Sequence, residues 1–132
     1  MGEHVVDALD LVYYWVSDMD RSVSFYRDVL GLDLIRQDGS SWAQFDICGR
    51  RFALHGAVEG QQVAPGGATA VFTVGDLDAA KAVLSARGVP VEHDGDVEGF
   101  ARFCSIKDPD GNVVELIEYE PGTEVHSRED AS

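Results

Sequence analysis

Residues 11–20 read Leu-Val-Tyr-Tyr-Trp-Val-Ser-Asp-Met-Asp, and residues 69–78 repeat the pattern as Thr-Ala-Val-Phe-Thr-Val-Gly-Asp-Leu-Asp. The two stretches align without a gap at an offset of 58 residues. Each copy continues into a segment with apolar residues at helical spacing, which ends at Gly31 in the first copy and at Gly88 in the second. The chain therefore contains one structural unit twice. Duplicated units commonly pack about a pseudo-twofold axis around a shared cavity.

Each copy predicts a strand, a helix and then three further strands. Hairpin turns at 48–50 and 110–112 align at an offset of 62, so the intervening loops differ by only a few residues. Asp18 or Asp20 is expected to cap the first helix. The predicted elements are strands over 11–16, 32–37, 42–47, 51–57, 70–74, 89–92, 101–107 and 113–119, a first helix that ends at Gly31, and a second helix over 79–87 with Ala80, Val83 and Leu84 facing inward.

Length and composition favour one globular domain. The chain has 132 residues, of which 45% are hydrophobic and 26% are charged, and this is enough to bury a core. We expect a single domain over 1–132, in which module one covers about 8–58, a linker 59–67, module two about 68–120 and a flexible polar tail 121–132.

Charge and hydropathy exclude several classes of partner. Acidic residues number 24 and basic residues 10, which gives a net charge of −14. This charge argues against nucleic acid and anionic membranes as partners and is compatible with solubility and with cationic ligands. No apolar run approaches the ~20 residues of a membrane span, and the N-terminus does not resemble a leader, so we expect a cytoplasmic protein.

Three segments resemble a known family. Residues 18–32 read Asp-Met-Asp-Arg-Ser-Val-Ser-Phe-Tyr-Arg-Asp-Val-Leu-Gly-Leu, residues 76–80 read Asp-Leu-Asp-Ala-Ala, and residues 107–118 read Lys-Asp-Pro-Asp-Gly-Asn-Val-Val-Glu-Leu-Ile-Glu. Together they resemble the vicinal oxygen chelate superfamily, which includes glyoxalase I, extradiol dioxygenases, methylmalonyl-coenzyme A epimerase, fosfomycin-modifying enzymes and bleomycin-resistance proteins. The resemblance implies an α+β fold of two tandem βαβββ modules, whose curved mixed sheets form a groove, with the helices on the convex side. It does not specify the chemistry.

The alternation along the strands assigns two faces to each predicted sheet. One set of positions is apolar and is expected beneath the helices: Val12, Tyr14, Val16, Phe52, Leu54, Ala70, Phe72, Val74, Val114 and Leu116. The opposite set is mixed and is expected to line the groove: Leu11, Tyr13, Trp15, Arg51, Ala53, His55, Thr69, Val71, Thr73, Val113, Glu115 and Ile117.

The resemblance also locates the positions where enzymes of this superfamily hold a divalent metal ion. These positions fall on Leu11, Ala53, Thr69 and Glu115. Glu115 is the one strong ligand among them, and one carboxylate with a threonine hydroxyl does not hold a divalent ion against water. We therefore expect no metal and no cofactor.

His55 and Glu115 leave alternatives open. His55 lies two residues after Ala53 and could approach Glu115 in a weak site, or it could form hydrogen bonds within the groove or at its rim. Glu115 could pair with Arg102 or Arg51. Without a basic partner, burial would raise its pKa and make it a usable acid or base.

The aromatic residues Tyr13, Trp15, Trp42 and Phe103, with His55, Thr69 and Glu115, predict a groove that binds a flat or cationic small molecule. We favour a metal-free binding protein of the resistance or sequestration type that forms a homodimer. The alternative is a lyase, isomerase or dioxygenase of glyoxalase type that uses His55 and Glu115 as catalytic residues. A regulatory or structural dimerisation module is a third option without a positive sign in the sequence.

Overall fold

The structure, a computed structural model, describes residues 7–123. It divides into two compact units. Unit 1 comprises the described residues up to Pro65 together with the turn 108–112, and unit 2 comprises 66–107 and the described residues from Val113 onward. Most of the tail predicted to be flexible lies outside the described residues. Within residues 7–123, no helix has the length and apolar content that crossing a bilayer requires.

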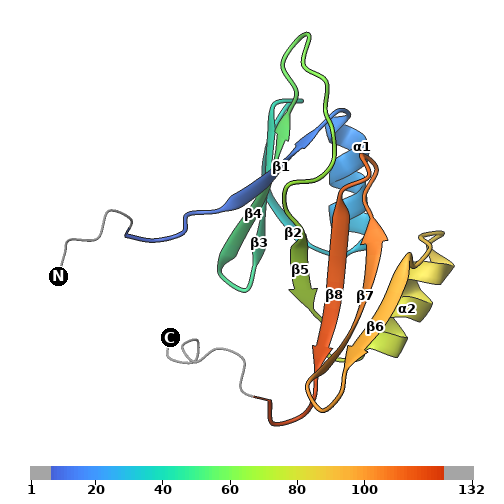
Figure 1. Cartoon of the computed structure of the whole chain (residues 1–132). Coiled ribbons are helices and arrows are strands. Elements are labelled where there is room, and N and C mark those ends of the chain that lie inside the picture. Colours follow the sequence, from blue (N-terminus) through green and yellow to red (C-terminus); the bar gives the residue numbers. More distant parts are fainter. Residues whose placement is uncertain (1–6, 124–132) are drawn as a thin grey trace. The chain divides into compact units, whose positions relative to one another are not determined.

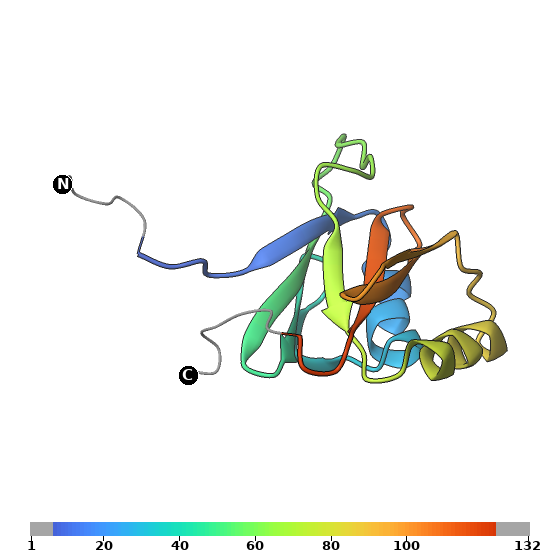
Figure 2. The same cartoon turned by 60° about the horizontal axis from the view of Figure 1, so that its bottom comes forward.

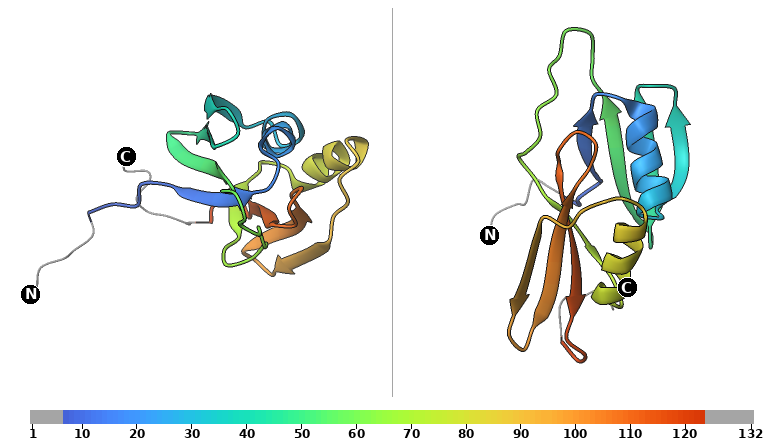
Figure 3. Two further views of the ribbon diagram at one scale, coloured as in Figure 1. Left: turned by 90° about the horizontal axis from the view of Figure 1, so that it is seen from above. Right: turned by 90° about the vertical axis from the view of Figure 1, so that its right-hand side faces the viewer.

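Unit 1 contains a mixed sheet in the order β1-β4-β3-β2 (Figure 1). Strands β1 and β4 are parallel, and the other neighbours are antiparallel. The helix lies over one face of this sheet, against β3 and β4 (Figure 3). The bounds are β1 Val12–Val16, α1 Met19–Ser24, the π-helical turn η1 Phe25–Val29, β2 Asp33–Asp38, β3 Trp42–Ile47 and β4 Arg50–Gly56.

Unit 2 repeats this arrangement with the sheet order β5-β8-β7-β6, and helix α2 lies against β7 and β8 (Figure 2). The bounds are β5 Ala70–Thr73, α2 Leu77–Ala86, β6 His93–Val97, β7 Ala101–Lys107 and β8 Val113–Tyr119. The predicted α+β fold of two βαβββ modules with curved mixed sheets is therefore confirmed.

The register of the parallel ladder in unit 1 recurs in unit 2, at the offsets of the sequence repeat. Tyr13 pairs with Ala53 between β1 and β4, and Val71 pairs with Glu115 between β5 and β8. Tyr13 and Val71 are 58 residues apart in the sequence, and Ala53 and Glu115 are 62 residues apart, which are the two offsets found in the sequence. Equivalent positions of the two modules can therefore be compared residue by residue.

Both helices begin at an aspartate that caps the first turn. The side chain of Asp18 accepts a hydrogen bond from the backbone N–H of Arg21 at 3.1 Å, and that of Asp76 accepts from Ala79 at 3.0 Å. Of the two predicted caps for the first helix, Asp18 is therefore the one used. Helix α2 begins two residues earlier than predicted, at Leu77, because Asp76 is its N-cap and accepts from the N–H of Ala79 in the first turn.

The first helix changes from α to π geometry after Ser24. The N–H of Leu30 donates to the carbonyl of Phe25 at 3.1 Å, and the chain leaves the helix through Gly31, whose φ is +79°. Phe25 and Tyr26, the first two residues of this wider turn, are both buried. Positive φ is also found at the predicted second helix end, Gly88.

The strand positions of unit 1 that were predicted to lie beneath the helix are buried, with one exception. Tyr14, Val16, Phe52 and Leu54 are buried. Val12 was expected beneath the helix but is 40% exposed, because it begins the edge strand β1, which has a neighbour on one side only.

In helix α2, the residues Leu77 and Leu84 are buried, but Val83 is 44% exposed instead of facing inward. It precedes Leu84 by one position and is therefore about 100° away around the helix. The third predicted inward residue, Ala80, is half-buried.

The strand predicted at 89–92 is wrong, since β6 instead covers His93–Val97. Its sequence, His-Asp-Gly-Asp-Val, has none of the apolar alternation that marks a strand. This strand forms because it is an edge strand that pairs with β7 alone, and the carboxylates of Asp94 and Asp96 can remain in solvent.

A buried polar cluster joins the turn 108–112 to the helix of unit 1. Asp108 accepts hydrogen bonds from the Tyr26 hydroxyl at 2.8 Å and from the backbone N–H groups of Asp110 and Asn112 at 2.9 and 2.8 Å. The Asn112 amide donates a further bond at 3.0 Å. Burial, and secondly the Asp108 carboxylate, raise the pKa of Tyr26 well above its usual value. Next to it, Asp110 accepts from the Ser17 hydroxyl at 2.5 Å.

Candidate functional site

Three adjacent strands of unit 1 bring four ring side chains together on one face of the sheet. His55 of β4 lies opposite Trp15 of β1 on one side and opposite Trp42 of β3 on the other, so the three form a row across the sheet. Tyr13 lies two residues before Trp15 and therefore points to the same side. These four residues, Tyr13, Trp15, Trp42 and His55, are called the aromatic face below.

The rings of the aromatic face are in mutual contact around the imidazole. The ring centroid of His55 lies 4.2 Å from that of Trp15, 5.2 Å from Tyr13 and 5.6 Å from Trp42. Tyr13 also meets both tryptophans edge to face, at 5.6 and 5.8 Å. Contacts of this kind hold the rings in defined orientations, so the surface is organised before any ligand arrives.

The aromatic face remains accessible although the opposite side of the same strands is core. Tyr13 is 41% exposed and Trp15 is 37% exposed, while Trp42 and His55 are half-buried. By contrast, Tyr14 and Leu54, their neighbours on these strands, are buried. Single apolar residues are common on an ordinary protein surface, but four adjoining rings on an accessible sheet face form a continuous patch, which is typical of a binding site.

Two polar groups of this surface have partners within the sheet. The Nδ1 atom of His55 lies 2.9 Å from the carbonyl oxygen of Gly56. The indole N–H of Trp42 donates to the Gln44 side chain at 3.3 Å. The imidazole is therefore fixed by a hydrogen bond as well as by ring contacts.

Gly56 is required by a close approach of two backbone segments. A Cβ atom at this position would lie 2.0 Å from the carbonyl oxygen of Ser40. The backbone N–H of Gly56 also donates to the carbonyl of Ser41 at 2.9 Å. The absence of a side chain thus lets the 40–41 turn close over the end of β4, directly beside His55.

The other predicted site residues belong to unit 2. Glu115 of β8 is half-buried and lies between Val71 of β5 and Ser105 of β7 in the sheet. Phe103 of β7 is half-buried and covers Gly95 of β6, where a Cβ atom would lie 2.4 Å from the phenyl ring. The structure therefore brings Tyr13, Trp15, Trp42 and His55 together in unit 1, and it places Phe103 and Glu115 on the sheet of unit 2, with Thr69 exposed just before β5.

The arginines considered as partners of Glu115 bind other carboxylates. Arg102 donates to both oxygens of Asp78, at 2.8 and 3.4 Å, and Arg51 pairs with Asp10. These ion pairs engage both arginines with aspartates of their own units. Hydrogen bonding to Arg102 lowers the pKa of Asp78 below its usual value.

The four positions at which the resemblance places metal ligands lack a cluster of donors. Ala53 is buried in β4, and Leu11 precedes β1. Thr69 and Glu115 lie in the other unit. Among residues 7–123, no group of three or more His, Cys, Asp or Glu side chains is arranged to hold a metal ion.

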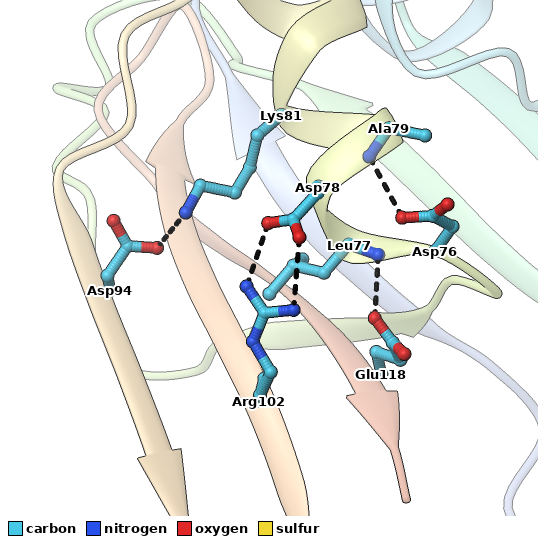
Figure 4. A network of polar contacts seen from close by, with 8 residues as sticks. All are labelled: Asp76, Leu77, Asp78, Ala79, Lys81, Asp94, Arg102 and Glu118. Carbon is cyan, nitrogen blue, oxygen red and sulfur yellow. Dashed lines mark hydrogen bonds and ion pairs between the residues drawn. The ribbon is translucent and has the colours of Figure 1, made fainter. Parts of the chain in front are cut away.

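A polar network that the sequence analysis missed surrounds the start of α2 (Figure 4). The backbone N–H of Leu77 donates to Glu118 at 2.8 Å, and Lys81 pairs with Asp94 at 2.6 Å. Together with the Asp78–Arg102 pair, these bonds connect the helix to β6, β7 and β8. A hollow of about 430 Å³ lies here, and both of its cations, Lys81 and Arg102, are paired with aspartates.

A family model described as Glyoxalase/Bleomycin resistance protein/Dioxygenase superfamily matches residues 4–116. No curated protein matches the sequence at a significant level. Among solved structures, the chain is similar to a lactoylglutathione lyase from Agrobacterium tumefaciens, with 25% identity and a TM-score of 0.73 over 86% of this chain and 95% of that one.

The chain is also similar to TnmS3, an antibiotic binding protein from Streptomyces sp. CB03234, with 28% identity and a TM-score of 0.71 over 89% of this chain and 100% of that one. A genomically encoded fosfomycin resistance protein, FosX from Listeria monocytogenes, shares the fold at 20% identity, with a TM-score of 0.68 over 85% of this chain and 90% of that one. That structure contains Mn(II) and 1S,2S-dihydroxypropylphosphonic acid.

Proposed function

This chain belongs to the Glyoxalase/Bleomycin resistance protein/Dioxygenase superfamily, and from that premise we propose that it binds an aromatic or cationic small molecule at the aromatic face without using a metal ion. The role would be sequestration of a toxic compound such as an antibiotic. The observation that carries the proposal is the accessible cluster of Tyr13, Trp15, Trp42 and His55 on one sheet face.

Two further observations support binding rather than metal-dependent catalysis. The positions where the resemblance places metal ligands carry Leu11, Ala53 and Thr69, which leaves Glu115 as the one strong donor. The antibiotic binding protein TnmS3 is 28% identical and is matched over its whole length. A binding protein needs a shaped, organised surface and no reactive centre, and the aromatic face meets that requirement.

The charge of the chain extends the proposal to cationic ligands. With a net charge of −14, the protein raises the local concentration of cations and lowers that of anions. Tryptophan rings attract a cation placed over their faces, with a contribution on the order of 1 kcal/mol per contact. A planar cation would therefore be favoured over a planar anion of the same size.

Tryptophan fluorescence tests this proposal directly, because both tryptophans of the chain, Trp15 and Trp42, lie in the aromatic face. A panel of planar aromatic compounds with positive, neutral and negative charge should quench the emission saturably in the first two cases. Trp15→Ala should weaken binding roughly five- to tenfold. The matched control is Phe100→Ala, which removes a similarly exposed ring (42%) of unit 2 that contacts Tyr119. Equal losses in both variants, or no saturable quenching by any compound, would contradict the proposal.

A second candidate function is a lyase, isomerase or dioxygenase reaction of glyoxalase type, with His55 and Glu115 as acid and base. Its support is the 25% identity to a lactoylglutathione lyase. The test is turnover of a glutathione hemithioacetal by the purified protein, with and without added divalent metal, in parallel with Glu115→Gln. Turnover that this variant abolishes would favour the enzyme over the binding protein.

We further propose that the protein forms a homodimer. The edge strands β1 and β5 carry exposed apolar residues, including Val12 at 40% and Val71 at 49%. Exposed edges with apolar side chains are commonly covered by a second copy around a twofold axis.

A further inference from the structure

We infer that His55 selects, among planar aromatic ligands of the aromatic face, those that carry a hydroxyl or N–H donor at their edge. The inference rests on the proposed binding function and names the chemical class of ligand more narrowly. It depends on which nitrogen of the imidazole carries the proton and on what surrounds the other nitrogen.

The hydrogen bond to Gly56 determines the tautomer of His55. The Nδ1 atom lies 2.9 Å from the Gly56 carbonyl oxygen. A carbonyl oxygen has no proton and can only accept, so the proton of this bond must be on Nδ1. In the neutral imidazole, Nε2 then carries a lone pair and acts as an acceptor.

The Nε2 acceptor is not used by the protein itself. Within residues 7–123, no hydrogen bond to Nε2 is formed, while Nδ1 is engaged with the backbone. The tryptophans of the aromatic face cannot serve as acceptors, because an indole N–H only donates. Nε2 is therefore the ring-nitrogen acceptor that this surface offers to a ligand.

The surroundings of the imidazole make this acceptor selective. His55 is half-buried and has Trp15, Trp42 and Tyr13 within 4.2 to 5.6 Å, so water reaches it less freely than it reaches an exposed histidine. A bound aromatic molecule that covers the imidazole without donating would leave Nε2 without a partner, which is costly. A molecule with a donor at the same place satisfies it.

The backbone maintains the tautomer because Gly56 is itself fixed in place. Its N–H is bonded to Ser41, and Ser40 lies too close to allow a side chain at position 56. The carbonyl that accepts from Nδ1–H is thus part of the strand β4 and its contact with the 40–41 turn. The selective acceptor is built into the sheet and does not depend on a mobile side chain.

The experiment compares 2-naphthol, which donates a hydrogen bond, with 2-methoxynaphthalene, which does not. Affinities are measured by tryptophan quenching for the wild type, His55→Phe, His55→Gln and the control Phe100→Ala. In the wild type and the control, 2-naphthol should bind roughly three- to tenfold more tightly than its methyl ether. His55→Phe keeps a ring but removes the acceptor, so the ratio should fall to about one, and His55→Gln should retain part of it.

Each outcome decides the inference. A ratio that is unchanged in His55→Phe would overturn it while leaving aromatic binding intact. If neither compound binds the wild type, this inference fails, and the proposed function fails with it if the cationic aromatic compounds do not bind either. Imidazole ¹⁵N chemical shifts of the free wild-type protein give an independent check that needs no variant to fold. They should show a proton on Nδ1 of His55, and a proton on Nε2 alone would overturn the inference.

Discussion

The hydroxyl of Tyr26 donates a hydrogen bond to the carboxylate of Asp108 at 2.8 Å, across 82 positions of sequence. Tyr26 is fully buried in the π-helical turn η1, and Asp108 begins the turn between β7 and β8. A turn of one hairpin is thereby secured to the core of unit 1.

Tyr26→Phe should lower the free energy of unfolding by about 1–3 kcal/mol, because it removes one donor from a buried carboxylate and leaves the ring contacts in place. Urea unfolding followed by circular dichroism measures the change. The control is Tyr119→Phe, since the Tyr119 hydroxyl forms no hydrogen bond in the described part of the chain. Equal stability of the two variants would show that the bond to Asp108 contributes nothing net.

We expect the raised pKa of Tyr26 to make the free energy of unfolding depend on pH in the alkaline range. Burial raises the pKa of Tyr26 above its usual 10.0, so the folded protein keeps the phenol neutral where the unfolded chain would ionise it. Below pH 10.0 the phenol is neutral in both the folded and the unfolded chain, and the folded state has its full stability. As the pH rises above 10.0, the unfolded chain ionises first, and the free energy of unfolding falls. The wild type should lose stability above this pH more steeply than Tyr26→Phe, and parallel pH profiles would contradict the prediction.

Gly56→Ala should destabilise the protein by about 1–3 kcal/mol or more, because its Cβ atom would lie 2.0 Å from the Ser40 carbonyl oxygen. The matched control is Gly75→Ala, where a Cβ atom would meet nothing within 4 Å and φ is not in the left-handed region. This control should be neutral or stabilising by about 0.4–1 kcal/mol. Thermal unfolding compares the two variants, and a neutral Gly56→Ala would refute the close approach.

The protein as purified should contain no stoichiometric divalent metal. The reason is the presence of Leu11, Ala53 and Thr69 where ligands would be needed. Elemental analysis provides the measurement, with Glu115→Ala as the companion variant. Close to one equivalent of zinc, nickel, manganese or iron per chain, lost in that variant, would refute the prediction.

Light scattering at micromolar concentration should give the mass of two chains. As a test of the edge-strand argument, Val71→Lys places a charge on an exposed apolar position of β5 and should shift the equilibrium toward the monomer. Val97→Lys, on β6 and 50% exposed, is the control at the opposite edge of that sheet. A monomer mass for the wild type would rule out the dimer.

The sequence predicted the fold well where two independent patterns agreed. The repeat offset and the strand alternation together located β7 and β8 with their observed bounds, and the two sequence offsets recur between the registers of the parallel ladders. Prediction failed for β6, because an edge strand of polar residues needs no apolar pattern to be stable. The prediction also failed for Val83, which is exposed, because the spacing of apolar residues along helix α2 does not show how wide its buried face is.

The candidate site could also be predicted only in part from the sequence. Alternation and spacing placed Tyr13, Trp15 and His55 on one face, but the sequence did not show that Trp42 would lie opposite His55. The role of Gly56 also escaped prediction, because its constraint comes from Ser40 in a different segment. Contacts between segments depend on the exact path of loops, which local pattern does not encode.

Because the register repeats, each ring of the aromatic face has a counterpart in the other module. The pair of Trp15 and His55 in unit 1 corresponds to the pair of Thr73 and Ile117 in unit 2. Trp42, on the other side of His55, corresponds to Phe103. Tyr13 corresponds to Val71. The two halves share a backbone, yet one half retains a single ring where the other has four. A titration should therefore saturate at one ligand per chain, and a dimer should present two equal and independent sites.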